Sequence, residues 1–79
     1  MIKKGKYRHY KGQDYEVFGV VLHTETEEPM VYYKALYAIE NYDTQMYGDV
    51  LQFVRPLSMW LEKVEVNGTS VDRFSFIEA

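Results

Sequence analysis

The sequence predicts a mainly β fold, a small β-barrel of about five strands with one short helical turn. Segments rich in β-branched and aromatic residues recur along the chain, separated by glycine, proline, asparagine and aspartate. A glycine interrupts the strongest segment where a barrel strand would bend, and an Asn-Gly dipeptide marks a hairpin near the C-terminus. The 79 residues predict a single domain, 1–79, with a small core.

The first strand is expected over 2–10, where polar and apolar residues alternate imperfectly. The alternation divides five side chains between two faces: Tyr7 and His9 on one, and Lys6, Arg8 and Tyr10 on the other. Only one of these faces can serve a ligand, because the other must help to hold the fold together.

The second and third strands are expected over 15–24 and 30–37, joined as a hairpin by the solvated segment 25–29. Gly19 predicts a bulge or sharp bend in the first of them. The segment 38–49 that follows loses the strand pattern, and is either a functional loop or an extended hairpin tip.

A short fourth strand is expected over 50–54, stopped by Arg55 and Pro56. One helical turn with Ser58 as its N-cap should then pack its apolar side on the barrel. A hairpin over 64–71 with a type I′ Asn-Gly turn and a last alternating segment, 74–77, complete the prediction.

Composition excludes several classes of function. There is no cysteine, which removes disulfides, zinc-thiolate sites and thiol nucleophiles and fits a reducing compartment. No apolar run is long enough for a membrane helix, and the N-terminus has no apolar signal core. We therefore expect a cytoplasmic protein that does not contact membranes and carries no cofactor.

The charge is unevenly distributed along the chain. The net charge is −3, but the first 12 residues hold five of the nine basic groups and no acidic group. Cations mixed with tyrosines are typical of sites for single-stranded nucleic acid. The alternative is a solvated edge strand whose lysines prevent aggregation, and the acidic remainder of the chain would repel a polyanion.

The two histidines, His9 and His23, are the simplest candidates for acid–base or metal chemistry. His23 and Glu25 could approach one metal ion, but two ligands at this spacing specify no site, so structural roles are favoured and no metal centre is predicted. No serine has the context of a nucleophile, and no catalytic residue is predicted.

For most of the eight tyrosines a structural role at the boundary of a small core is favoured, but a few residues suggest a protein-binding surface. A loop-borne tryptophan and methionine beside an arginine, as in Arg55, Met59 and Trp60, have the composition of a binding hot spot, and Tyr32 could join them. Trp60 could equally fill the core.

The order of these motifs resembles domain-of-unknown-function family 1653, a family of small bacterial proteins. The resemblance covers nearly the whole chain and is carried by Gly5 to Gly12, Tyr15-Glu16-Val17, His23 to Thr26, Val31 to Tyr37, Val54 to Leu57 with Met59-Trp60, Val64 to Gly68, and Arg73-Phe74. It implies an SH3-like small β-barrel and no assigned activity.

We therefore expect a non-enzymatic binding module that recognises a protein or a small anionic ligand. In this interpretation Arg55 pairs with a carboxylate or phosphate and aromatic side chains supply contact area. The expected ligand-binding residues are Tyr7, His9, Tyr10, His23, Glu25, Tyr32, Arg55 and Trp60. The alternative is nucleic-acid or nucleotide binding through the N-terminal strand, and the sequence leaves open whether the chain forms a homodimer.

Overall fold

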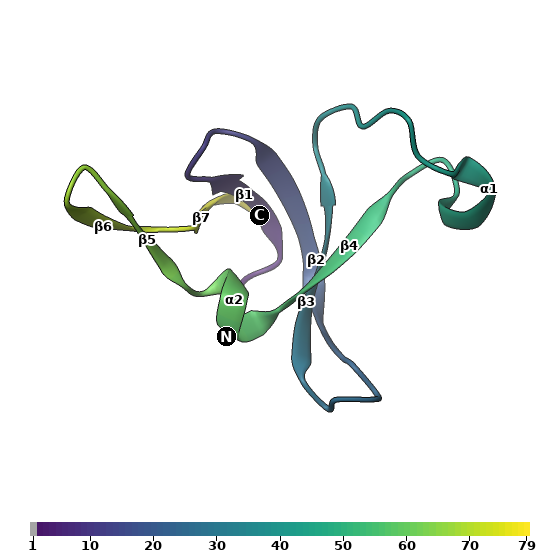
Figure 1. Cartoon of the computed structure of the whole chain (residues 1–79), viewed down its shortest axis with the longest axis horizontal. Helices are drawn as coiled ribbons and strands as arrows, with labels where there is room; N and C mark the ends of the chain where they lie inside the picture. The colour runs from purple at the N-terminus through teal and green to yellow at the C-terminus, as the bar shows by residue number, and fades with distance from the viewer. Residues whose placement is uncertain (1) are drawn as a thin grey trace.

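Two antiparallel sheets organise the computed structural model, which describes residues 2–79 (Figure 1). The first has five strands in the order β4-β3-β2-β1-β7, and the second pairs β5 with β6. The elements are β1 Gly5–His9, β2 Asp14–Leu22, β3 Pro29–Ala35, α1 Thr44–Tyr47, β4 Gln52–Pro56, α2 Leu57–Trp60, β5 Lys63–Val66, β6 Thr69–Asp72 and β7 Phe74–Glu78. The mainly β prediction is confirmed.

β2 and β3 form the predicted hairpin, from Tyr15 paired with Ala35 to Leu22 paired with Pro29. The pairing register shifts between Val17 and Gly19, which confirms the predicted irregularity. Gly19 has φ +155, a value that side-chain-bearing residues rarely adopt, so glycine suits this point of the strand.

The core lies on one face of the five-stranded sheet and is mostly aromatic. Its fully or nearly buried members are Tyr7, Val17, Val31, Tyr33, Trp60 and Phe74. α2 places Trp60 over this face, where its indole stacks on the Phe74 ring with centroids 3.7 Å apart and planes 2° apart. Because the helix is a single turn, this packing, rather than helix propensity, holds it in place.

Two predictions at the fourth strand and the helix are wrong. β4 runs through Arg55 and Pro56 instead of stopping before them, and Pro56 is tolerated because β4 is an edge strand. The residue before α2 is Pro56, with no side-chain cap, so Ser58 lies inside the helix rather than capping it.

The other turns follow the sequence more closely. Asn67 and Gly68 have φ values of +51 and +79, so both central residues have the positive φ predicted for the β5–β6 hairpin. The pairing of β3 with β4 ends at Lys34 and Gln52, so the segment between them is a loop and not an extended hairpin. Within this loop the Asp43 side chain caps α1 by accepting from two backbone N–H groups.

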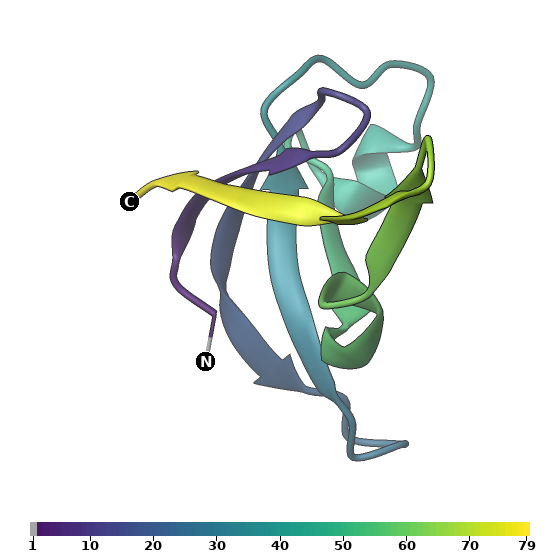
Figure 2. The same cartoon turned by 90° about the vertical axis from the view of Figure 1, so that its left-hand side faces the viewer.

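The sheet is strongly twisted, and β7 crosses the direction of β2 and β3 in Figure 2. Its edge strands are β4 and β7, and these two strands do not pair with each other within residues 2–79. Closure into an SH3-like barrel therefore stays a prediction. None of the helices described, over residues 2–79, is long and apolar enough to cross a membrane.

Candidate functional site

Half-buried polar side chains lie beside the aromatic core at the end of the sheet where β1 finishes. Strand alternation directs Tyr15 and Tyr33 to the core face, because each lies two residues from a buried valine. Arg55 follows the same rule on β4, where it pairs with the fully buried Val31. We call the cluster that results the basic aromatic site. Its members are His9, Tyr15, Tyr37, Arg55, Arg73 and Phe74.

Phe74 is the centre of the basic aromatic site. The His9 ring lies edge-on to it with centroids 4.9 Å apart, and the Tyr15 ring does the same at 5.8 Å. The Arg55 guanidinium carbon lies over the Phe74 ring, 5.4 Å from its centroid. Since Trp60 stacks on Phe74 as well, the core fixes the platform on which the polar groups are arranged.

Arg55 has no acidic partner within residues 2–79. Its one side-chain hydrogen bond in this part of the chain is a long one, from Nε to the Tyr33 hydroxyl at 3.4 Å. By contrast, Arg8 and Lys34 in the same sheet form ion pairs with the carboxylates of Asp14 and Glu16, respectively. The terminal nitrogens of Arg55 are therefore left to bind water or an anion.

Arg73 adds a second guanidinium, close enough to His9 for its charge to lower the pKa of that histidine. Its Nη2 lies 3.5 Å from a Glu62 carboxylate oxygen, a loose contact for an ion pair. Its Nε is buried without a hydrogen-bond partner in residues 2–79. A buried donor without a partner carries a desolvation cost that an added acceptor would remove.

His9 reports on the electrostatics of the site. Burial lowers the pKa of His9, and the positive charges of Arg55, Arg73 and Lys11 lower it further. Its Nδ1 accepts a hydrogen bond from the Lys11 backbone N–H at 3.2 Å, so neutral His9 carries its proton on Nε2. The imidazole is thus a neutral donor at pH 7 among three cations.

Tyr15 and Tyr37 supply hydroxyl groups at the edge of the site. Their oxygens are 2.9 Å apart, and their rings meet at 80°. Burial, followed by the hydrogen bond to Tyr37, raises the pKa of Tyr15, so its hydroxyl stays protonated at any physiological pH. Tyr37 is exposed, which leaves this hydroxyl pair accessible from solvent.

The structure separates the predicted ligand-binding residues into four groups. His9, Tyr10 and Arg55 lie at or beside the basic aromatic site, with the Tyr10 ring 4.6 Å from that of His9. Tyr10 follows the end of β1, so the prediction that it shares a face with Lys6 and Arg8 does not describe its contacts. Tyr7 and Trp60 are core residues, 5% and 2% exposed.

His23 and Glu25 lie in the turn between β2 and β3. His23 Nδ1 accepts from the backbone N–H groups of Glu25 and Thr26, which is a structural role in the turn. The His9 backbone N–H donates to the Gln13 carbonyl just before β2 begins, and His23 follows the end of β2, so roughly 30 Å of strand separates them. The two histidines therefore cannot share a metal ion or a substrate.

Tyr32 lies on the other face of the sheet. Its hydroxyl donates to the Gln52 side chain, and its ring packs 5.0 Å from that of Phe18. It is thus remote from Arg55, although the two residues are in neighbouring strands.

The basic N-terminal segment is partly neutralised. Arg8 and Lys6 both contact the Asp14 carboxylate, at 2.8 and 3.6 Å. Tyr7 is buried and donates its hydroxyl proton to the Lys3 carbonyl, so it cannot stack on a base. Two cations and one aromatic ring of this segment are therefore less available to nucleic acid than the alternative hypothesis requires.

Sequence reasoning missed four members of the basic aromatic site: Tyr15, Tyr37, Arg73 and Phe74. The alternation of the third strand already grouped Tyr37 with Tyr33. What the sequence does not reveal is the strand order, which brings β7 beside β1 and so places Phe74 opposite His9.

The fold and the site together define a small, mainly β protein with a positively charged aromatic surface. The chain belongs to the family described as Protein of unknown function (DUF1653), whose model matches residues 5–76. It is similar to the crystal structure of a DUF1653 protein from Bordetella bronchiseptica, at 32% identity and a TM-score of 0.80, over 96% of this chain and 87% of that one. The chain matches no curated protein.

Proposed function

We propose that the protein is a non-enzymatic binding module that recognises an anionic group, of a protein or a small molecule, at the basic aromatic site. The observation that carries the proposal is the guanidinium of Arg55, half-buried over Phe74 and without an acidic partner in residues 2–79. A guanidinium held in place by an aromatic ring loses little conformational freedom when it binds a carboxylate or phosphate.

The neighbouring groups favour an anion over a neutral ligand. Arg73 adds a second positive charge near His9, and neutral His9 offers Nε2–H. The hydroxyl groups of Tyr15 and Tyr37 are hydrogen-bonded to each other, which leaves one O–H of the pair to donate as well. Several donors that converge on one area and few acceptors are typical of a carboxylate or phosphate site.

The test is a titration of the isotopically labelled protein with phosphate, acetate and adenosine 5′-monophosphate, followed by NMR. We expect saturable shifts of the His9 ring and the Arg55 Nε–H signals in the wild-type protein. Arg55→Met keeps an apolar side chain over Phe74 but removes the charge, and should weaken binding by about tenfold to a hundredfold.

The matched control is Lys63→Met, since Lys63 is an exposed cation on β5 that pairs with Asp72. It removes the same formal charge and should leave the affinity within about twofold, as expected of an exposed pair. Equal losses in the two variants, or no saturable shift in the wild-type protein, would show that the basic aromatic site does not recognise anions.

We also propose that the fold is an SH3-like barrel. A twisted five-stranded sheet with α2 packed on its core face supports an SH3-like barrel that is open between β4 and β7. A cytoplasmic location is proposed on the absence of cysteine.

A further inference from the structure

β4 leaves one edge of the five-stranded sheet open next to the basic aromatic site. The strand pairs with β3 on one side only, and no backbone hydrogen bond joins its other side to any segment within residues 2–79. In an antiparallel pair, alternate residues direct their N–H and C=O groups away from the neighbouring strand. β4 therefore presents a row of free donors and acceptors to which an extended chain can add.

Arg55 brings a positive charge to this open edge. Its guanidinium lies over Phe74 on the core face, and its one side-chain hydrogen bond within residues 2–79 is the long contact with the Tyr33 hydroxyl. The preceding residue, Val54, projects to the opposite face of the sheet, where it is 53% exposed. An extended segment beside β4 would therefore meet a cation on one face and, at the next position, an apolar side chain on the other.

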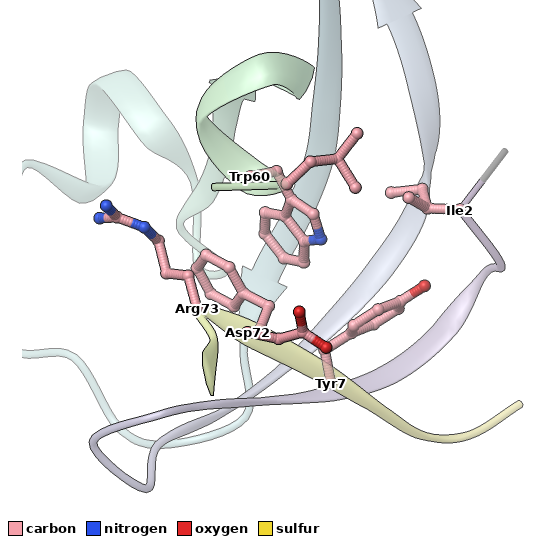
Figure 3. A pocket seen from close by; sticks show the side chains of 7 residues that line it. Ile2, Tyr7, Trp60, Asp72 and Arg73 are labelled. Carbon is pink, nitrogen blue, oxygen red and sulfur yellow. The ribbon is translucent and has the colours of Figure 1, made fainter. Parts of the chain in front are cut away.

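The charges around Arg55 favour an acidic segment over a basic or neutral one. The charges of Arg55, Arg73 and Lys11 all lower the pKa of His9, and β4 itself contains no acidic residue. Figure 3 shows the Arg73 guanidinium pointing away from the hollow of about 120 Å³ beside Trp60, so its charge is not enclosed there. A carboxylate at Arg55 would thus enter a region of positive potential.

The other edge of the sheet, β7, lacks this charge pattern. It is exposed from Ser75 onward, contains no cation and ends with the carboxylate of Glu78. An acidic segment would find no ion-pair partner on β7. The charge distribution therefore assigns such a segment to the β4 edge.

We propose that the free edge of β4 binds an extended segment of a partner protein, in which an acidic residue pairs with Arg55 and an adjacent apolar residue packs on Val54. This inference rests on the proposed function, because the acidic side chain occupies the basic aromatic site. It adds the class of partner and the way in which it binds. Backbone hydrogen bonds to β4 supply affinity, and the two side chains supply specificity. Pro56, which has no N–H, ends the added pairing beside Arg55.

The probe is the peptide acetyl-Thr-Val-Glu-Val-Thr-amide, in which valine flanks the glutamate on both sides, so it fits either strand direction. NMR titration of the isotopically labelled protein should give saturable shifts along β4 and at the Arg55 Nε–H signal. At saturating peptide, amide exchange should slow at alternate residues between Gln52 and Arg55, because one alternating set faces the added strand.

Modified peptides separate the side-chain contribution from the backbone contribution. Replacing the glutamate by glutamine should weaken binding by about fivefold to tenfold, since the hydrogen bond to Arg55 loses one of its charges. N-methylation of the glutamate, or instead of the valine that follows it, places a methyl group on one edge of the strand or on the other. One of these two peptides should bind at least about tenfold more weakly than the other, because its methyl group faces β4.

Variants of the protein test the two side chains. Arg55→Met should bind the glutamate and glutamine peptides equally, whereas the matched control Lys63→Met should keep the wild-type preference. Val54→Thr keeps the branched shape at an exposed strand position and should weaken peptide binding several-fold without changing the affinity for acetate. The amide spectrum of each variant away from the substituted residue verifies its fold.

The failure of this inference can be distinguished from the failure of the proposed function. Saturable binding of acetate and adenosine 5′-monophosphate at Arg55 without binding of the peptide would overturn the inference alone. Equal affinity for the glutamate and glutamine peptides in the wild-type protein, or equal affinity for the two N-methylated peptides, would also overturn it. Slower exchange in β4 that develops with protein concentration alone would assign the edge to a second copy of the chain and would exclude the proposed partner.

Discussion

Among the side chains of the basic aromatic site, Arg55 gives the strongest support for anion binding. Its place over Phe74 and its long contact with the Tyr33 hydroxyl leave most of its hydrogen-bonding capacity unused within residues 2–79. A binding role for Arg55 could be predicted from the sequence. Its surroundings could not, because they come from β1, β2 and β7 at once.

The charge of Arg55 should be measurable through His9. Because that charge contributes to the lowering of the His9 pKa, Arg55→Met should raise the pKa of His9, as measured by NMR titration of the imidazole. Lys34→Met is the control, since Lys34 is a cation on the same sheet that does not act on His9. An unchanged His9 pKa in Arg55→Met would contradict the geometry.

The lowered His9 pKa also predicts a dependence of stability on pH. Protonation is disfavoured in the folded state relative to the unfolded chain, whose histidine pKa is near 6.5. The contribution of His9 to the free energy of unfolding is therefore unchanged above this value and falls as the pH drops through it. In His9→Gln the urea-denaturation midpoint should therefore fall less between pH 7 and pH 5 than it does in the wild-type protein. An equal fall in the two proteins would contradict the prediction.

Gly5 is the residue at which a single methyl group should be most costly. A Cβ there would collide with the Glu78 carbonyl oxygen and lie 2.8 Å from the Ala79 Cα, and φ is +135. We expect Gly5→Ala to lower the free energy of unfolding by about 2–4 kcal/mol, from backbone strain and overpacking together.

The control for Gly5 is Gly12→Ala, where φ is +108 but no atom lies within 4 Å of the added Cβ. That variant isolates the cost of φ and should lose about 1–2 kcal/mol. Urea denaturation of the two variants measures the difference, and equal losses would argue against the close approach of the C-terminal backbone to Gly5.

Among the elements, α2 depends on tertiary packing more than on its local sequence. Its spacing of apolar residues predicted a helical turn, which is present, but the predicted cap at Ser58 is absent. A four-residue helix has no stability of its own, so the stacking of Trp60 on Phe74 positions it. The sequence left the role of Trp60 open between core and ligand surface, and the structure makes it a core residue, 2% exposed.

Trp60→Ala should therefore destabilise the protein by about 3–5 kcal/mol, a large part of the stability of a domain this small. Met59→Ala, on the same helical turn but with a side chain 44% exposed, should cost less than about 1 kcal/mol. Urea denaturation followed by circular dichroism compares the two. A loss in Trp60→Ala no larger than that in Met59→Ala would mean that Trp60 does not anchor the core.

For the molecule as a whole, local patterns could predict the strands but not their neighbours. Alternation and turn residues were sufficient for β1, β2, β3, the bulge near Gly19 and the Asn67-Gly68 hairpin, because each depends on nearby residues. The pairing of β7 with β1 joins residues more than sixty positions apart, and no local signal encodes it. The candidate site lies where these distant strands meet.

The loop between β3 and β4 shows the same limit. Its polar composition predicted irregular structure but not α1, whose Asp43 cap forms only when the following residues turn. The separate β5–β6 sheet was likewise predicted as a hairpin, but not as one that leaves the main sheet (Figure 1). The loop contributes Tyr37 to the basic aromatic site, whereas the β5–β6 sheet contributes no residue to it.

The most direct test of anion recognition is a crystal structure of the protein soaked with selenate, located by the anomalous scattering of selenium. We expect selenate within hydrogen-bonding distance of the Arg55 terminal nitrogens and His9 Nε2, and its loss in crystals of Arg55→Met. Selenate bound only at other lysines or arginines, or retained beside His9 in Arg55→Met, would contradict the account.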